Sequence, residues 1–401
     1  MKKFYLFNLL ICLGLGEMQA QSPWVLRNSG TQKNLYQICS VGTDALIIPG
    51  DSGIFLRWNT TDPLWSLVQL PTQKPIVSVE NILFQNEGTK TLLLGNDGSV
   101  FKVQLPDFQW FSETLPENAP PGSKTRKLVH LNIGGNNEIR YGILCDSGKI
   151  VACKKPWPNP RFDIQLSTRL QVNDLFPFNT WNLLAVGDSG KIWKAVGLDD
   201  PFLPINHGLT TESLNRVFLQ GSRLWVVGNN GTLLSSTNQG NSWTAIETGT
   251  QAHLYGGCAI DSVLWLAGAN GTLLSSPTPG QNWIQHQTGS THTLRDIRKF
   301  NNSLYAVGDK GTILENQLFT RNLGSRNNLA LQKSGSRLYL WSAQESPTRF
   351  RLTDLAGKTL VDTDLEPRTV LSWQAGASGI YLIQSQVAGA PVESRKIFLE
   401  L

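Results

Sequence analysis

Residues 226–243 read VVGNNGTLLSSTNQGNSW, and the pattern of this stretch returns along the chain at a nearly constant interval. The pattern is an apolar run, a glycine, two small or polar residues, a second glycine, another apolar run and then an aromatic residue. Seven copies occur in the 401 residues, and the first positions of successive copies lie 40 to 50 residues apart. These first positions are Gly50, Gly95, Cys145, Gly187, Gly228, Gly268 and Gly308. An interval of this length is typical of the blades of a β-propeller rather than of a helical solenoid.

Each copy reads as a β-hairpin, because β-prone runs flank a tight link rich in Asp, Asn, Ser and Gly. The second glycine is present in all seven copies, as a backbone position with positive φ requires. The first glycine is replaced once, by Cys145, so we interpret it as a packing position that accepts any small residue. The Asp residues of the links have a turn role that accounts for them without catalysis; they are Asp51, Asp146, Asp188 and Asp309.

An aromatic residue stands fifteen residues after the first position in five copies: Trp65, Trp110, Phe202, Trp243 and Trp283. The third copy has Pro160 there, with Trp157 and Phe162 nearby, and the seventh has Leu323. We predict that these aromatics pack between blades. The stretch from Trp24 has the same form as the stretches from Trp243 and Trp283, so we expect the N-terminal strand to complete the last blade. Such pairing would remove an open strand edge.

The ends of the repeat region differ from its middle. Residues 1–20 contain two lysines, an apolar stretch and a final Ala20, which predicts a secretory signal peptide and no stable membrane span. The mature chain keeps Cys39, Cys145, Cys153 and Cys258. Export permits disulfides, but Cys39 and Cys258 hold equivalent places in blades that are not neighbours, so we expect mostly buried thiols.

Charge and motifs exclude several classes of function. The formal net charge of +5 and the pI of about 8.9 are spread along the chain without a block of five like charges, which gives no support to nucleic-acid binding. The sequence has no HExxH, no Cys-x-x-Cys and no Gly-rich phosphate loop ahead of a helix, so we predict neither a metal nor another cofactor. Four polar residues beside the first-strand apolar positions could point to the centre of the ring or could be solvated loop residues. We take them as candidate binding residues: Arg216, Arg295, Asp296 and Arg298.

The wording LWVVGNNGTLLSSTNQGNSW resembles the repeats of the photosystem II assembly-factor-like propeller family. The end of that unit is also similar to the Asp-box turn of sialidase-type propellers, through Ser236, Asn238, Gly240, Ser242 and Trp243, with Asn238 in place of the Asp. The resemblance covers about residues 22–324 and implies a binding scaffold. It names no ligand.

From about Asn327 a different pattern begins, with DLAGK at 354–358, GIYL at 379–382 and a final Lys396 followed by apolar residues. These stretches resemble the C-terminal sorting domain of the type IX secretion system of Bacteroidetes, although the Pro-Asn-Pro opening of that family is absent. The resemblance implies an address read by the secretion machinery. The residues that carry it are Asp354, Gly357, Lys358, Gly379, Tyr381 and Lys396. A plain accessory β-sandwich is the alternative.

The sequence therefore predicts an all-β protein. We expect a signal peptide (1–20), a seven-bladed β-propeller closed by the N-terminal strand (21–324), and a small antiparallel β-sandwich that acts as the sorting domain (325–401). The leading functional hypothesis is a monomeric, non-catalytic protein, secreted or held at the outer cell surface, that binds a protein or a glycan. A glycoside hydrolase or lyase would need two carboxylates about 5 to 10 Å apart. An envelope-complex assembly factor rests on the resemblance alone.

Overall fold

The computed structural model describes residues 24–60, 64–84, 88–104, 107–113, 124–131, 140–154, 162–166, 170–179, 182–196, 200–260, 262–301, 303–317, 329–334, 337–342, 348–354, 356–365, 370–374, 379–387 and 393–399. The signal-peptide segment, Trp157, Pro160 and Leu323 lie outside these residues. The regular secondary structure described is strands and single 3-10 turns. Among the described residues, no helix has the length and apolarity that a membrane span needs.

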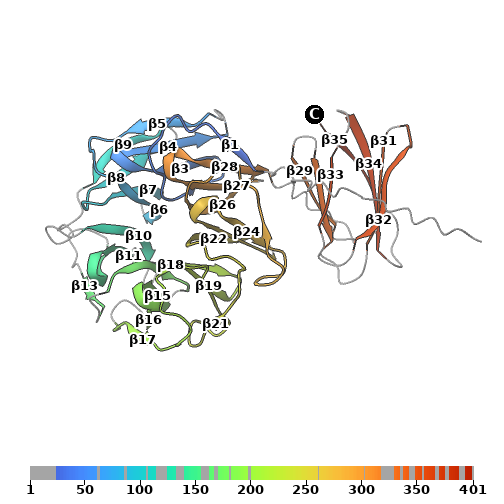
Figure 1. Cartoon of the computed structure of the whole chain (residues 1–401). Coiled ribbons are helices and arrows are strands. Elements are labelled where there is room, and N and C mark those ends of the chain that lie inside the picture. Colours follow the sequence, from blue (N-terminus) through green and yellow to red (C-terminus); the bar gives the residue numbers. More distant parts are fainter. Residues whose placement is uncertain are drawn as a thin grey trace, which may run out of the picture.

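Within residues 25–317 the described strands form seven four-stranded antiparallel sheets, here numbered 1 to 7 along the chain, and Figure 1 shows them side by side around a common centre. Sheet 1 contains β2 (Cys39–Val41), β3 (Ala45–Pro49), β4 (Ile54–Asn59) and β5 (Ser66–Gln69). Sheet 2 contains β6 (Ile76–Phe84), β7 (Gly88–Gly95), β8 (Val100–Gln104) and β9 (Gln109–Glu113). Sheet 3 contains β10 (Thr125–Leu131), β11 (Arg140–Cys145), β12 (Lys149–Lys154) and β13 (Phe162–Gln165). Sheet 4 contains β14 (Val172–Pro177), β15 (Asn182–Gly187), β16 (Ile192–Val196) and β17 (Leu203–Ile205).

The last three sheets follow the same plan. Sheet 5 contains β18 (Leu214–Gln220), β19 (Arg223–Gly228), β20 (Leu233–Ser236) and β21 (Thr244–Ala245). Sheet 6 contains β22 (Leu254–Ile260), β23 (Val263–Gly268), β24 (Leu273–Ser276) and β25 (Ile284–Gln285). Sheet 7 contains β26 (Leu294–Phe300), β27 (Ser303–Gly308), β28 (Ile313–Gln317) and, from the other end of the region, β1 (Val25–Arg27).

The N-terminal strand β1 pairs with β28 of sheet 7, as its sequence predicted. In β1, Val25 pairs with Glu315 and Arg27 with Ile313 of β28. Trp24, 5% exposed, meets the ring of Trp265 from sheet 6 edge-on, with ring centroids 5.7 Å apart. The strand therefore joins the last repeat and adds an aromatic to its contact with sheet 6, a pair worth about 1 kcal/mol beyond its buried area.

The spaced aromatics pack between sheets, as predicted. Trp243 of sheet 5 belongs to a core cluster with sheet 4, and Trp283 of sheet 6 packs against a cluster that contains Trp225 of sheet 5. Trp65 of sheet 1 meets Tyr305 of sheet 7, with ring centroids 6.1 Å apart. Each aromatic thus contacts the sheet before its own. The second strand of each sheet is buried on both faces by these contacts, which explains its continuous apolar run.

The second glycine of the pattern is required for two reasons. Gly231 has φ +68°, and a Cβ there would lie 1.8 Å from the carbonyl oxygen of Thr250 in the loop that leads to the next sheet. Gly311 repeats this arrangement with the carbonyl oxygen of Thr31, near the N-terminal strand. The sequence predicted the positive φ but not the close approach.

The first glycine is more restricted than predicted. At Gly228 and Gly308, whose backbones are not left-handed, a Cβ would lie 2.5 and 1.9 Å from the carbonyl oxygens of Ser213 and Thr293. The third copy admits Cys145 at this position, fully buried. The expectation that any small residue fits is therefore wrong for the copies in which the backbone of the preceding loop comes this close.

His286 of sheet 6 gives this part of the fold a dependence on pH. Its ring stacks on Trp265 with centroids 4.9 Å apart, and a 2.8 Å hydrogen bond joins its Nε2 to Ser275 Oγ. Burial lowers the pKa of His286 to about 4. Between pH 6.5 and 4 the unfolded chain therefore binds a proton at this site that the folded chain does not.

We expect the folded protein to lose about 2 kcal/mol of stability from His286 as the pH falls through this window, less than the full shift implies because the ring is not completely buried. Urea unfolding at pH 7 and at pH 4.5 would measure the loss. The His286→Gln variant should show a smaller loss, and equal pH dependence in the two proteins would contradict this role of His286.

The C-terminal strands form two further antiparallel sheets, in the orders β29-β30-β33 and β32-β31-β34-β35. Their bounds are β29 (Leu329–Ser334), β30 (Arg337–Ser342), β31 (Thr348–Asp354), β32 (Thr359–Leu365), β33 (Val370–Gln374), β34 (Gly379–Val387) and β35 (Glu393–Leu399). Phe350, Leu352, Tyr381 and Ile383 are buried on one face of the four-stranded sheet.

The residues that carry the sorting-domain resemblance lie in that four-stranded sheet. The Asp354 carboxylate accepts a 2.9 Å bond from the Lys358 amide at the β31–β32 turn, where Gly357 has φ +81°. Gly379 begins β34, and Tyr381 of the same strand pairs with Asp354 of β31. Lys396 of β35 pairs with Leu382 of β34. The residues that carry the resemblance thus occupy the β31–β32 turn and the paired strands of a single sheet.

Candidate functional site

The first strands of the sheets converge at the centre of the repeat region. In six of them the pairing with the second strand shifts register immediately after the first residue, as between Leu214 and Arg216. This bulge turns the next side chain away and directs the third toward the centre. The seven residues at the third position, counted in sheet 1 from Leu35, whose bridge to Gly50 precedes β2, are Gln37, Ser78, Lys127, Asp174, Arg216, Gly256 and Asp296. We call them the central cluster.

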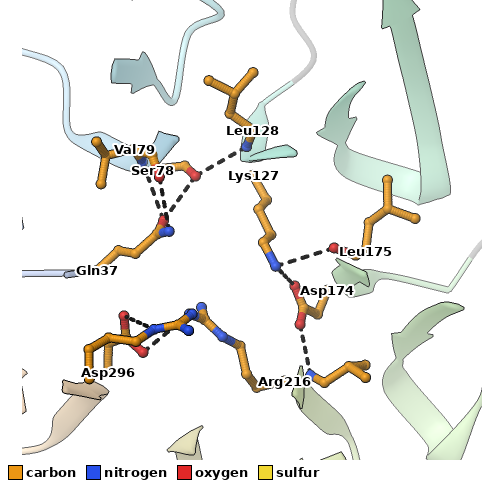
Figure 2. Close-up of polar contacts among 11 residues, drawn as sticks. Gln37, Ser78, Val79, Lys127, Leu128, Asp174, Leu175, Arg216 and Asp296 are labelled. Carbon is orange, nitrogen blue, oxygen red and sulfur yellow. Dashed lines mark hydrogen bonds and ion pairs between the residues drawn. The ribbon is translucent and has the colours of Figure 1, made fainter. Parts of the chain in front are cut away.

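Four charged members of the central cluster form two ion pairs (Figure 2). Lys127 of sheet 3 pairs with Asp174 of sheet 4, and Arg216 of sheet 5 pairs with Asp296 of sheet 7 at 3.2 Å. Asp174 and Asp296 are 1% and 0% exposed. Arg216 reaches across sheet 6 because the third position there is Gly256, where a Cβ would lie 2.9 Å from the Asp296 Cα.

The acceptors of the central cluster also fasten neighbouring sheets. The second oxygen of Asp174 accepts a 2.8 Å bond from the Val217 amide of the next sheet, and that of Asp296 accepts a 2.9 Å bond from the Ile38 amide. Figure 2 shows the neutral members doing the same: Gln37 Oε1 accepts from Val79, and Ser78 Oγ accepts from Leu128. Asp174 therefore satisfies one buried cation and one buried amide, and Asp296 does the same while also pairing with Arg298 at 3.6 Å.

The central cluster divides the centre into two sides. On one side are the second positions of the first strands and the glycine turns; we call this the turn side. Here Arg126 pairs with Asp146 at 2.9 Å, and Arg295 pairs with Asp309 at 2.5 Å. The Tyr36 hydroxyl donates a hydrogen bond to the Asp51 carboxylate. The Arg295 guanidinium lies over the Tyr36 ring, with its Cζ 5.4 Å from the ring centroid. About a third of the Arg126 and Arg295 side chains is exposed.

On the opposite side are the fifth positions of the same strands, which we call the hairpin side. The residues at this position are Cys39, Glu80, Val129, Phe176, Phe218, Cys258 and Arg298, of which Val129 and Phe218 are buried in the cores between sheets. Burial raises the pKa of the Glu80 carboxyl, while nearby Asp296 raises the pKa of Arg298. Burial also raises the pKa of both thiols to about 12, so they are neutral at physiological pH.

The four candidate binding residues occupy three different places. Arg216 and Asp296 are a buried ion pair within the central cluster, Arg295 lies on the turn side, and Arg298 lies on the hairpin side with 42% of its side chain exposed. The structure thus does not bring the three arginines together on one rim.

Sequence reasoning missed Lys127, Asp174 and Glu80, which complete the charged centre. Aligning the third and fifth positions of all seven first strands would have found them, because the repeat places those positions around the same centre. The thiols of Cys39 and Cys258 are free, and the side chain of Cys153 lies outside the described residues. In the part of the chain that the structure describes, no three His, Cys, Asp or Glu side chains are placed to hold a metal ion.

Comparisons with known proteins agree with this architecture. A family model described as the DUF6242 beta propeller domain matches residues 179–293. No curated protein matches the chain.

Among solved structures, YCF48 bound to D1 peptide is similar over 74% of this chain and 95% of its own, with 18% identity and a TM-score of 0.61. YCF48 from Cyanidioschyzon merolae covers 73% of this chain and 98% of its own, with 14% identity and a TM-score of 0.58. Virginiamycin B lyase from Staphylococcus aureus covers 74% of this chain and 100% of its own, with 14% identity and a TM-score of 0.58. At these identities the likeness shows the β-propeller fold alone.

Proposed function

We propose that the seven sheets are the blades of a closed seven-bladed propeller spanning residues 21–324. Three contacts between the two ends of the region support closure: β1 pairs with β28, the Leu35 amide donates to the Gly308 carbonyl at 3.0 Å, and the Gly311 amide donates to the Lys33 carbonyl at 2.7 Å. A shared core cluster, which includes Leu35, Ile48 and Tyr305, joins the first and seventh sheets.

We propose that this propeller is a non-catalytic binding protein and that its turn side holds the ligand, a protein segment or a glycan. The observation that carries the proposal is the central cluster, whose carboxylates are committed to cations and amides that fasten the blades. Ligand contacts then fall to the partly exposed side chains around it, and the turn side offers Arg126, Arg295 and Tyr36. The similar YCF48 structure with a bound peptide supports a peptide-like ligand.

Peptide and glycan arrays probed with residues 21–324 would test this proposal. The best-bound probe should bind at least about tenfold more weakly to the Arg126→Gln/Arg295→Gln double variant, because charged hydrogen bonds of about 1.5–3 kcal/mol are lost. Lys299→Gln, an exposed residue of β26, is the matched control and should bind as the wild type does. Equal binding by all three proteins would refute a turn-side site.

An enzyme is the competing function, since a lyase is among the similar structures. Glu80 is the carboxylate to test first, because it is the titratable acid of the hairpin side and its pKa is raised. Saturable turnover of a polysaccharide that Glu80→Gln abolishes would establish an enzyme. Co-purification of a defined membrane complex from envelope fractions would instead favour an assembly factor.

We further propose that residues 1–20 direct export and that residues 325–401 are a type IX sorting domain that forms a β-sandwich. Support comes from the signal-like N-terminus and from the placement of Asp354, Gly357, Tyr381 and Lys396 on the turns and strands of one sheet. A variant ending at residue 324 should accumulate in the periplasm of a host that has this system. Secretion at the wild-type level would rule out the sorting role.

A further inference from the structure

The turn side repeats one contact from sheet to sheet. The side chain at the second position of the first strand hydrogen-bonds to the first residue of the turn in the same sheet. Sheets 1, 3 and 7 do so in the pairs described above, sheet 4 through Asn173 and Asp188, and sheet 5 through Asn215 and Asn229. Sheet 6 departs from this rule, because its second position is Tyr255 and its turn begins with Ala269.

Tyr255 therefore keeps a hydroxyl that its own sheet does not use. The register shift between Leu254 and Gly256 gives Tyr255 the same position in its strand as Arg295 has after Leu294. The side chain is partly exposed, and within the part of the chain that the structure describes its hydroxyl makes no hydrogen bond.

The second positions of sheets 3, 4 and 5 are more fully used, since they also bond to the next sheet. Arg126 Nη2 donates to Gln171 Oε1 at 2.6 Å. Asn173 and Asn215 donate to the first carbonyl of the following sheet's first strand, at 3.0 and 2.8 Å. These side chains fasten neighbouring sheets and leave few groups for a ligand.

Sheets 7 and 1, by contrast, keep polar groups available. Arg295 bonds to Asp309 through its Nε, and among the described residues its two terminal nitrogens make no hydrogen bond. Asp309 and Asp51 each accept a side-chain hydrogen bond on Oδ1 only, from Arg295 and from Tyr36. All four side chains are partly exposed. Unused donors and acceptors thus lie beside each other.

The backbone brings Tyr255 to the same place. Sheets 6 and 7 approach closely after it, because a Cβ at Gly256 would lie 3.2 Å from the Arg295 carbonyl oxygen. On its other side Arg295 lies over the Tyr36 ring, 5.4 Å from the centroid. The strand that carries Arg295 is therefore flanked by two chain segments that each carry a tyrosine at the equivalent position.

This combination of groups fits a sugar. A hydroxyl group both donates and accepts a hydrogen bond, so two adjacent sugar hydroxyls can accept from the terminal nitrogens of Arg295 and donate to the second oxygen of Asp309. The ion pair has no net charge, and Asp51 adds a negative charge nearby, which disfavours an anionic ligand. Tyrosine rings bury the apolar face of a sugar while their hydroxyls form hydrogen bonds.

We infer that the turn side binds a neutral oligosaccharide over sheets 6, 7 and 1. Two adjacent hydroxyls contact Arg295 and Asp309, and the Tyr255 hydroxyl bonds to the same sugar. The inference rests on the proposed turn-side function and makes it more specific, because it names the ligand class and places the ligand away from Arg126. A peptide, as in the similar YCF48 structure, is the competing ligand.

Calorimetric titration of residues 21–401 tests the ligand class. The neutral probes are maltohexaose, mannohexaose and xylohexaose, the acidic probe is hexagalacturonate, and the peptide probe is an acetylated and amidated hexapeptide of glycine and serine. We expect at least one neutral probe to bind about tenfold tighter than the acid and the peptide, the difference that one charged hydrogen bond gives. Failure of all neutral probes to bind, or tighter binding of the acid or the peptide, would overturn the inference.

The turn-side proposal has a separate fate in this experiment. If the acid or the peptide bound best and lost its affinity in the Arg126→Gln/Arg295→Gln double variant, the turn side would still be the binding site while the neutral-sugar inference failed.

Single variants locate the sugar. Arg295→Gln should bind the best neutral probe at least about tenfold more weakly, and Tyr255→Phe about threefold more weakly, because a charged and a neutral hydrogen bond are lost. Arg126→Gln should lose less than Arg295→Gln, and Lys299→Gln should bind as the wild type does. Since the Tyr255 hydroxyl bonds to no described residue, Tyr255→Phe should keep the wild-type denaturation midpoint, which separates binding from a structural role. Equal losses in the two arginine variants, or unchanged affinity in both Arg295→Gln and Tyr255→Phe, would overturn the inference.

Discussion

Replacing Asp296 with alanine should lower the free energy of unfolding by about 3–5 kcal/mol, because it leaves buried charge without its partner. Arg216, with 12% of its side chain exposed, loses its ion pair, and the Ile38 amide of the first sheet loses its acceptor. Arg298 loses the carboxylate closest to it as well. Urea unfolding monitored by tryptophan fluorescence would measure the change.

Asp309→Ala is the matched control for this prediction. Its ion pair with Arg295 is shorter than that of Asp296 with Arg216, 2.5 Å against 3.2 Å, but about a quarter of the Asp309 side chain and a third of the Arg295 side chain are exposed. Such pairs contribute about 0–1 kcal/mol. The loss of stability in Asp296→Asn, which keeps an acceptor oxygen, should lie between the losses of the two alanine variants. If the two alanine variants lost the same stability, the central cluster would not be the element that fastens the blades.

Gly231→Ala should destabilise the protein by about 3–5 kcal/mol, the second large effect. Two costs add there: the left-handed backbone that a side chain disfavours, and the overlap of a Cβ with the Thr250 carbonyl oxygen at 1.8 Å. Backbone cannot move aside as a flexible side chain can. Thermal and urea denaturation of the variant would give the magnitude.

Gly249→Ala separates these two costs. Gly249 has nearly the same φ as Gly231, +73° against +68°, but a Cβ there would meet nothing within 4 Å. Only the conformational cost of about 1–2 kcal/mol applies. A similar loss at both glycines would mean that the close approach to Thr250 is relieved without cost, and that φ alone explains the repeated glycine.

The sequence was sufficient to predict the repeat, the sheets that the repeat forms and the pairing of the N-terminal strand with the last sheet. The period located each hairpin, and the shared form of the Trp24 and Trp243 stretches predicted that the first strand would join the last repeat, because those signals are local and recur. The pairing of Arg216 with Asp296 was not predictable in this way. It joins sheets that are not neighbours and depends on the missing side chain at Gly256, a combination that only the arrangement in space shows.

The candidate site was predicted less well for a related reason. Residues 295, 296 and 298 are close in sequence, but the bulge after Leu294 and strand alternation send Arg295 to the turn side and Asp296 to the centre. Apolar spacing gives no warning of a bulge. Glu80 was missed because it is a single charged residue in an otherwise ordinary strand, and Lys127 because it stands beside Arg126 in a strand that carries no motif.

The pairing of β1 with β28 also determines when the molecule can finish folding. Nearly three hundred residues separate Arg27 from its partner Glu315, so β1 stays without its neighbouring strand until β28 has been synthesised. Pairing over such a distance in sequence favours slow maturation. A chain cut short after the sixth repeat would leave β1 without its partner strand β28. The interval before this pairing forms is the time in which a chaperone, or an export channel that needs an unfolded chain, can bind the protein.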